Sequence, residues 1–151
     1  MKLGSLLAIS PSGGQVHHVL GAPYRFLVTS ETTGGAFALI ESTALAGSAV
    51  PLHLHTREDE TFFVLEGTME AQCQDSLIKL EKGATAFLPR GIPHSYRNPG
   101  DSAARYLVLI TPGGFEKCLE EFGRLPANQP PDMQTLVAIG KRYGLEFVSP
   151  S

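Results

Sequence analysis

Four side chains of types that bind metal ions stand at spacings that would bring them together. His53 and His55 lie two residues apart in an extended run, and residues i and i+2 of a β-strand point to the same face. Glu60 begins the next apolar run, and His94 begins a later one after a turn rich in proline and glycine. Three neutral imidazoles and one carboxylate suit one divalent transition metal ion, namely Fe, Mn, Ni, Co, Cu or Zn. Coordination beyond these four ligands would leave positions open for water, substrate or dioxygen.

The elements that would position these residues are short strands joined by tight turns. Between residues 67 and 100 a turn residue recurs every 8 or 9 positions, and short runs of apolar and β-branched residues separate the turns. This spacing is typical of an antiparallel sandwich or barrel, and it leaves no room for the crossover helices of a parallel sheet. The predicted strands are Glu60–Leu65, Thr68–Cys73, Leu77–Leu80, Thr85–Leu88, His94–Arg97 and Arg105–Ile110.

The flanking segments add two strands and two helices. Tyr24–Thr29 and Ala36–Glu41 are predicted strands, joined by a glycine turn. An apolar stripe at helical spacing predicts a helix over Gly114–Gly123, and Asp132 fits the N-cap of a second helix that runs to about Arg142. The chain therefore divides into a 1–19 N-terminal extension, a 20–112 barrel and a 113–151 helical C-terminal tail that packs on the barrel or on a partner.

Composition and charge exclude several classes of protein. The 16 Gly and 11 Pro disfavour a helical bundle, because these are the poorest residues inside a helix. A net charge of −3 lacks the basic footprint of a nucleic-acid binder, and no apolar run approaches the roughly 20 residues that span a bilayer. Cys73 and Cys118 form neither a metal pair nor a disulfide framework, so we expect a cytoplasmic protein with reduced thiols.

Two sequence motifs around the four residues resemble those of a known family. The first runs from Gly47 through His53, His55 and Glu60 to Gly67, with spacers of 5, 1, 4 and 6 residues. The second runs through the residues Gly83, Pro89, Gly91, His94 and Asn98, with spacers of 5, 1, 2 and 3 residues. Both motifs are similar to those of the cupin superfamily at every fixed position. The resemblance implies a double-stranded β-helix, a jelly-roll-like barrel that holds a metal ion. It also implies a homodimer and the metal ligands His53, His55, Glu60 and His94.

A narrower resemblance bears on the reaction. The run from Thr33 to Phe37 and the stretches 57–60 and 112–116 look like small bacterial monocupins described as quercetin 2,3-dioxygenase-like. This likeness implies a metal-dependent dioxygenase that acts on a small organic or aromatic substrate, flavonol- or diketone-like, with Glu60 as catalytic proton acceptor. Three aromatic residues on strands near the ligands are the predicted substrate-binding residues: Phe62, Phe87 and Tyr96.

Two alternatives stay open at this stage. A metal-dependent isomerase or epimerase of a sugar or keto compound would use the ion to polarise a carbonyl. Phosphosugar substrates would then need cations in the cavity, and the candidates are Arg57, Arg90 and Arg97. A non-enzymatic cupin that binds or senses a small molecule is the other alternative. We interpret Glu58 and Asp59 as part of a solvated loop beside the ligands.

Overall fold

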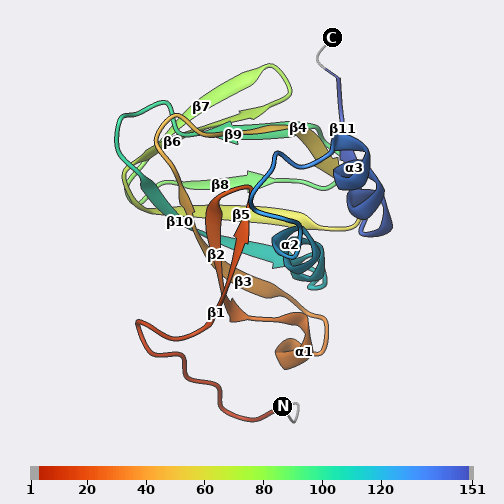
Figure 1. Cartoon of the computed structure of the whole chain (residues 1–151). Helices are drawn as coiled ribbons and strands as arrows, with labels where there is room; N and C mark the ends of the chain where they lie inside the picture. Colours follow the sequence, from red (N-terminus) through yellow and green to blue (C-terminus); the bar gives the residue numbers. More distant parts are fainter. Residues whose placement is uncertain (1–3, 150–151) are drawn as a thin grey trace.

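The computed structural model describes residues 4–149 and shows two antiparallel β-sheets facing each other (Figure 1). The larger sheet has six strands in the order β1 (Gln15–Val19), β2 (Ala22–Val28), β3 (Ala38–Ala44), β10 (Ala104–Thr111), β5 (Asp59–Glu66) and β8 (Thr85–Leu88). The smaller sheet has five in the order β11 (Leu145–Phe147), β4 (Ala49–His55), β9 (His94–Arg97), β6 (Thr68–Cys73) and β7 (Ser76–Glu81). The predicted all-β architecture with a minor helical tail is confirmed.

The core lies between the two sheets, because alternate residues of the strands point inward. On β10 every second residue is buried, from Ala104 to Ile110, and β3 shows the same alternation. Phe62 on β5 and Met69 on β6 meet this layer from neighbouring strands and are also fully buried. The two sheets therefore share one apolar interior. The candidate metal-binding residues lie at the ends of strands that border it.

Gly67 makes the tight corner between β5 and β6 that the sequence motif predicts. Its φ of +78° is a conformation that residues with a side chain rarely adopt. A Cβ atom here would also lie 2.9 Å from Cα of Ala104, on the neighbouring β10. The glycine is thus required both by the turn and by the close approach of two backbones.

Three helices complete the described part of the chain: α1 (Ser30–Thr33), α2 (Glu116–Gly123) and α3 (Met133–Arg142). Both predicted helices are confirmed, and the Asp132 side chain accepts hydrogen bonds from the backbone N–H groups of Gln134 and Thr135. The single turn α1 was not predicted and occupies part of the segment between β2 and β3. Across residues 4–149, no helix is both long and apolar enough to cross a membrane.

Both ends of the described chain contribute an edge strand. β1, from the segment predicted as an N-terminal extension, forms a hairpin with β2. β11, from the predicted tail, pairs with β4 and places Phe147 opposite His53. The helices follow the same arrangement, since α2 packs on β1 and α3 packs on β11 (Figure 1). The tail therefore packs on the barrel, next to the strand that carries two of the candidate ligands.

Candidate metal centre

Three strands from two sheets carry the four candidate ligands. His53 and His55 lie on β4, where they alternate with the less buried Leu52 and Leu54. His94 lies on β9 in register with His53, and Glu60 lies on β5 of the other sheet. All four side chains are buried. The site therefore forms where the two sheets approach each other.

The structure brings the four side chains to one point. One ligand atom from each of His53, His55, Glu60 and His94 lies within 4.8 Å of all the others. Nε2 of His55 lies 3.4 Å and Nε2 of His94 lies 3.2 Å from the same carboxylate oxygen, Oε2 of Glu60. Ligand atoms bound at about 2.1 Å from an ion lie at most about 4.2 Å apart, so a small contraction would close the cluster around a metal.

Backbone carbonyls orient two of the imidazoles. Nδ1 of His53 lies 2.7 Å from the carbonyl oxygen of Pro51, and Nδ1 of His94 lies 3.1 Å from that of Ile92. A ring that donates from Nδ1 to a carbonyl keeps the lone pair on Nε2 for a metal. With a metal ion bound, this tautomer would leave Nε2 of both rings free to coordinate the ion. The donor set and its orientation fit a divalent transition metal ion.

The electrostatics of the cluster call for positive charge beside Glu60. Burial lowers the pKa of His53 to about 4. Burial acts in the same direction on His55, but the carboxylates of Glu60 and Glu58 outweigh it and raise the pKa of His55 to about 9. Burial would raise the pKa of Glu60, but the charge on His55 and hydrogen bonds from His55 and His94 hold it well below its ordinary value. A proton on His55 or a bound metal cation can supply the positive charge that balances the Glu60 carboxylate.

Glu58 is not in a solvated loop, contrary to the expectation from sequence. The residue is only 5% exposed, and its Oε2 lies 3.6 Å from Nδ1 of His55. The neighbouring Asp59 does face outward, where it accepts hydrogen bonds from the backbone and the guanidinium of Arg90. The loop alternates, so Glu58 turns toward the cluster while Asp59 turns away. The spacing His55-x-x-Glu58 was the only local signal for this contact.

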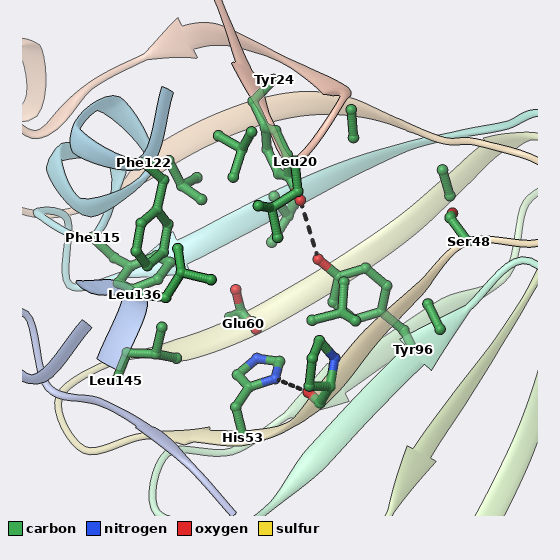
Figure 2. A pocket seen from close by; sticks show the side chains of 18 of the residues that line it. Leu20, Tyr24, Ser48, His53, Glu60, Tyr96, Phe115, Phe122, Leu136 and Leu145 are labelled. Carbon is green, nitrogen blue, oxygen red and sulfur yellow. Dashed lines mark hydrogen bonds between the residues drawn. The ribbon is translucent and has the colours of Figure 1, made fainter. Parts of the chain in front are cut away.

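A cavity of about 260 Å³ opens beside the four ligands (Figure 2). Most of the side chains around it are apolar, and they come from both sheets and from the tail, including Phe115, Leu136 and Leu145. His53, His55 and Glu60 contribute polar atoms to its wall. The helical tail thus forms part of the cavity wall rather than a separate appendage.

Two of the three predicted substrate-binding aromatics line this cavity, and one does not. Phe62 and Tyr96 form part of the wall, with their rings edge to face at 4.9 Å. Phe87 is 61% exposed and is not among the described residues around the cavity. Alternate residues of β8 face opposite sides, and since Leu88 points inward, Phe87 points out. The expectation for Phe87 is therefore wrong.

Three tyrosine hydroxyls gather in the wall of the cavity. The hydroxyl of Tyr106 donates to that of Tyr96 at 3.4 Å, and the hydroxyls of Tyr24 and Tyr96 lie 3.5 Å apart. Figure 2 shows Tyr24 and Tyr96 facing each other, with Glu60 and His53 across the same cavity. Hydrogen bonds between hydroxyls are usually about 2.7–2.8 Å long, so these contacts are loose. The hydroxyls can therefore exchange partners with a bound molecule.

None of the three predicted cations offers free charge to the cavity. Arg90 is paired with Asp59 at the surface. Arg57 donates to the carbonyl oxygen of Arg142, and it is not among the described residues around the cavity. Arg97 does contribute to the wall, but its guanidinium is bound to Glu70 at 2.6 Å. Among residues 4–149, the polar groups facing the cavity are thus mainly imidazole, carboxylate and phenol.

Comparison with protein families and with curated proteins finds similarity over the middle of the chain. Residues 41–110 match the cupin domain family. The tetracenomycin polyketide synthase protein TcmJ of Streptomyces glaucescens is 27% identical over 109 residues, which are 72% of this chain and 70% of that protein. The quercetin 2,3-dioxygenase of Bacillus subtilis is 34% identical over 71 residues, which are 47% of this chain but only 21% of that enzyme.

Solved structures agree with this match. An RmlC-like cupin from Shewanella frigidimarina aligns with a TM-score of 0.64 at 15% identity, over 75% of this chain and 96% of that one. The polyketide cyclase RemF from Streptomyces resistomycificus aligns with a TM-score of 0.62 at 21% identity, over 71% of this chain and 80% of that one. Likeness at these identities shows the fold alone. Residues 41–110 therefore match the cupin domain family, and the described chain shares the fold of these two solved structures.

Proposed function

We propose that this protein is a metal-dependent dioxygenase whose substrate is a small, flavonol- or diketone-like aromatic compound. The observation that supports it best is the convergence of His53, His55, Glu60 and His94 on one point at the wall of an apolar cavity. The likeness to a quercetin 2,3-dioxygenase over 71 residues supports the same reaction class. An apolar cavity with a few convergent polar groups is the usual form of a small-molecule site.

A divalent ion held by these four residues would supply a Lewis-acidic centre with open positions for a substrate oxygen and dioxygen. The chain's own residues have three further tasks. Phe62 and Tyr96 hold the aromatic ring of the substrate, and the apolar wall excludes water from it. The hydroxyls of Tyr24 and Tyr96 bind a second oxygen of the substrate, away from the metal. The substrate class is therefore an aromatic compound with oxygen functions at both ends.

Glu60 is the proposed proton acceptor. A substrate hydroxyl that enters beside His53 and His55 comes within reach of the Glu60 carboxylate, since all three residues line the cavity. Transfer of the hydroxyl proton to Glu60 leaves an electron-rich oxyanion on the substrate. A cation bound beside Glu60 would keep this carboxylate a weak base, so the transfer would require Glu60 to detach from the ion.

A second candidate is ring closure of an aromatic polyketide without dioxygen. The observation that favours it is the match to TcmJ, which covers far more of both chains than the match to the quercetinase does. RemF, a polyketide cyclase, has the same fold. The residues would have the same tasks, with Glu60 moving a proton from carbon or oxygen of the chain that closes. Oxygen consumption separates the two reactions.

The cavity argues against the sugar isomerase alternative. A sugar needs many hydrogen-bonding partners, whereas the described wall is mostly apolar and its one guanidinium, that of Arg97, is bound to Glu70. A module that only binds or senses a small molecule has the same requirements as the first step of either enzyme. Multiple turnovers by the purified protein would exclude that alternative.

The test is oxygen uptake by protein loaded separately with Fe²⁺, Mn²⁺, Co²⁺ or Ni²⁺. We expect aerobic, but not anaerobic, conversion of a flavonol or a diketone, with about one O₂ consumed for each substrate molecule. The His94→Ala variant serves as the control that lacks one ligand. Absence of uptake with every metal would reject the dioxygenase, and equal product formation without air would favour ring closure.

We further propose that the protein is a cytoplasmic homodimer. The edge strand β7 of the smaller sheet exposes Leu77 and Ile78 by 58% and 50%. An exposed apolar edge strand is a surface on which a second copy can pair. Light scattering should give a mass twice that of the single chain, which is 16.2 kDa. The Ile78→Lys substitution should lower the measured mass toward that of the single chain.

A further inference from the structure

We propose that Glu58 is a positioning residue for the metal site, one that holds His55 and balances the second charge of a divalent ion. This inference rests on the metal site proposed above. Glu58 lies in the short turn between β4 and β5, three residues after His55. It is outside the motif positions that make up the ligand set.

The orientation of His55 differs from that of the other two histidines. His53 and His94 direct Nδ1 at backbone carbonyls, whereas Nδ1 of His55 has no hydrogen-bond partner within residues 4–149. Oε2 of Glu58 likewise lacks a partner among these residues, and the two atoms are 3.6 Å apart. A shift of a few tenths of an ångström would make the hydrogen bond. Glu58 thus stands where the carbonyl stands for the other two rings.

Burial makes this contact exclusive. The side chains of His55 and Glu58 are 2% and 6% exposed, so water does not replace either partner readily. The ring of Phe115, at the start of α2, lies edge-on to His55 at 4.4 Å and closes one side. Arg57 donates to the carbonyl of Arg142 instead, and within the described chain Glu58 has His55 as its one ion-pair partner.

The charges also favour a second carboxylate near the site. Three neutral imidazoles and the Glu60 carboxylate together carry a charge of −1. A divalent ion bound to them would give a buried site with a net charge of +1. With Glu58 at 3.6 Å from His55 the local charge of the protein becomes −2, and the loaded site is neutral. An uncompensated charge in an apolar interior is costly, so this arrangement favours a divalent over a monovalent or trivalent ion.

The test compares Glu58→Gln with Asp59→Asn, a matched removal of charge one residue away on the surface. We expect the dissociation constant for Zn²⁺, measured by competition with a chelator, to rise about 10–100-fold in Glu58→Gln. Asp59→Asn should bind as the wild type does, because its carboxylate faces Arg90. Glu58→Asp keeps the charge and should recover part of the affinity. Equal Zn²⁺ affinity in Glu58→Gln and wild type would overturn the proposal.

A second measurement uses the wild type alone and does not depend on any variant folding. In Zn²⁺-loaded protein the Nδ1–H of His55 should give a slowly exchanging, downfield proton NMR signal, as expected for a donor held by a buried carboxylate. A His55 ring protonated on Nε2 instead would contradict the assignment. If wild-type protein does not bind Zn²⁺ at all, the metal site itself fails, which the chelator competition reveals separately.

Discussion

Nε2 of His94 lies 3.2 Å from Oε2 of Glu60, although the two residues are 34 positions apart in the chain. His94 belongs to the smaller sheet and Glu60 to the larger one. The contact is therefore a bridge between sheets, and His53 and His55 reach the same point from β4. A metal ion at this point would join the two halves of the fold. Its binding should consequently be visible in the stability of the whole protein.

The first prediction concerns metal and stability. A free Zn²⁺ concentration about 100 times the dissociation constant should raise the free energy of unfolding by about 2.7 kcal/mol. For a chain of this size the melting temperature should rise by about 5–10 °C. Calorimetry with and without chelator measures the shift. The His94→Ala protein should show little shift, and a full shift in that variant would contradict the bridge.

The second prediction concerns the tyrosine hydroxyls. Removal of one hydrogen bond costs about 0.5–1.5 kcal/mol, so Tyr96→Phe should weaken binding of a hydroxylated flavonol about 2–13-fold. The ring remains and continues to pack on Phe62. Fluorescence titration of metal-loaded protein measures the affinity. Phe87→Ala is the control, because that side chain is exposed on β8 and should leave the affinity unchanged. Equal losses in both variants would refute this view of the cavity.

The third prediction compares two glycines of the family motifs. Gly67 and Gly83 both have positive φ, +78° and +86°, but of the two only Gly67 has backbone so close that an added Cβ would lie 2.9 Å from it, at Cα of Ala104. Gly83→Ala should cost about 1–2 kcal/mol of stability, the cost of the left-handed conformation. Gly67→Ala should cost about 1–3 kcal/mol more, because the added methyl group overpacks the contact. Urea unfolding of both variants measures the difference, and equal midpoints would contradict the close approach.

The fourth prediction concerns Cys118 and the packing of α2. Burial, with the nearby negative charges of Glu121 and Glu58, raises the pKa of the Cys118 thiol to about 12. At pH 8 only about one thiol in ten thousand is then ionised, and the fraction rises about tenfold for each unit of pH. Iodoacetamide should label Cys73 first, as followed by mass spectrometry. Rapid labelling of Cys118 in folded protein at pH 8 would show that α2 does not stay packed.

The convergence of His53, His55, Glu60 and His94 could be predicted from sequence because its signals are local. The period of two on β4 places His53 and His55 on one face, and turn glycines fix where the following strands begin. The helices of the tail could be predicted equally well, since Asp132 and the apolar stripe before Gly123 are local signals too. Each of these features depends on a few neighbouring residues.

The parts that failed depend on contacts between distant segments. Glu58 is buried partly because Phe115 and α2 cover the adjacent His55. No residue near Glu58 in the sequence predicts this contact. In β8 both Phe87 and Leu88 are apolar, so the pattern does not say which one points inward. Pairing with β5 decides it, because Leu88 stands opposite the inward-facing Glu60.

Metal content tests most directly whether His53, His55, Glu60 and His94 form one metal site. Protein loaded with Zn²⁺ and freed of excess metal should contain about one ion per chain by elemental analysis, whereas His53→Ala and His94→Ala should contain almost none. His18→Ala, an exposed histidine on β1, should keep the full content. Full metal content in either ligand variant, or none in the wild type, would contradict the account.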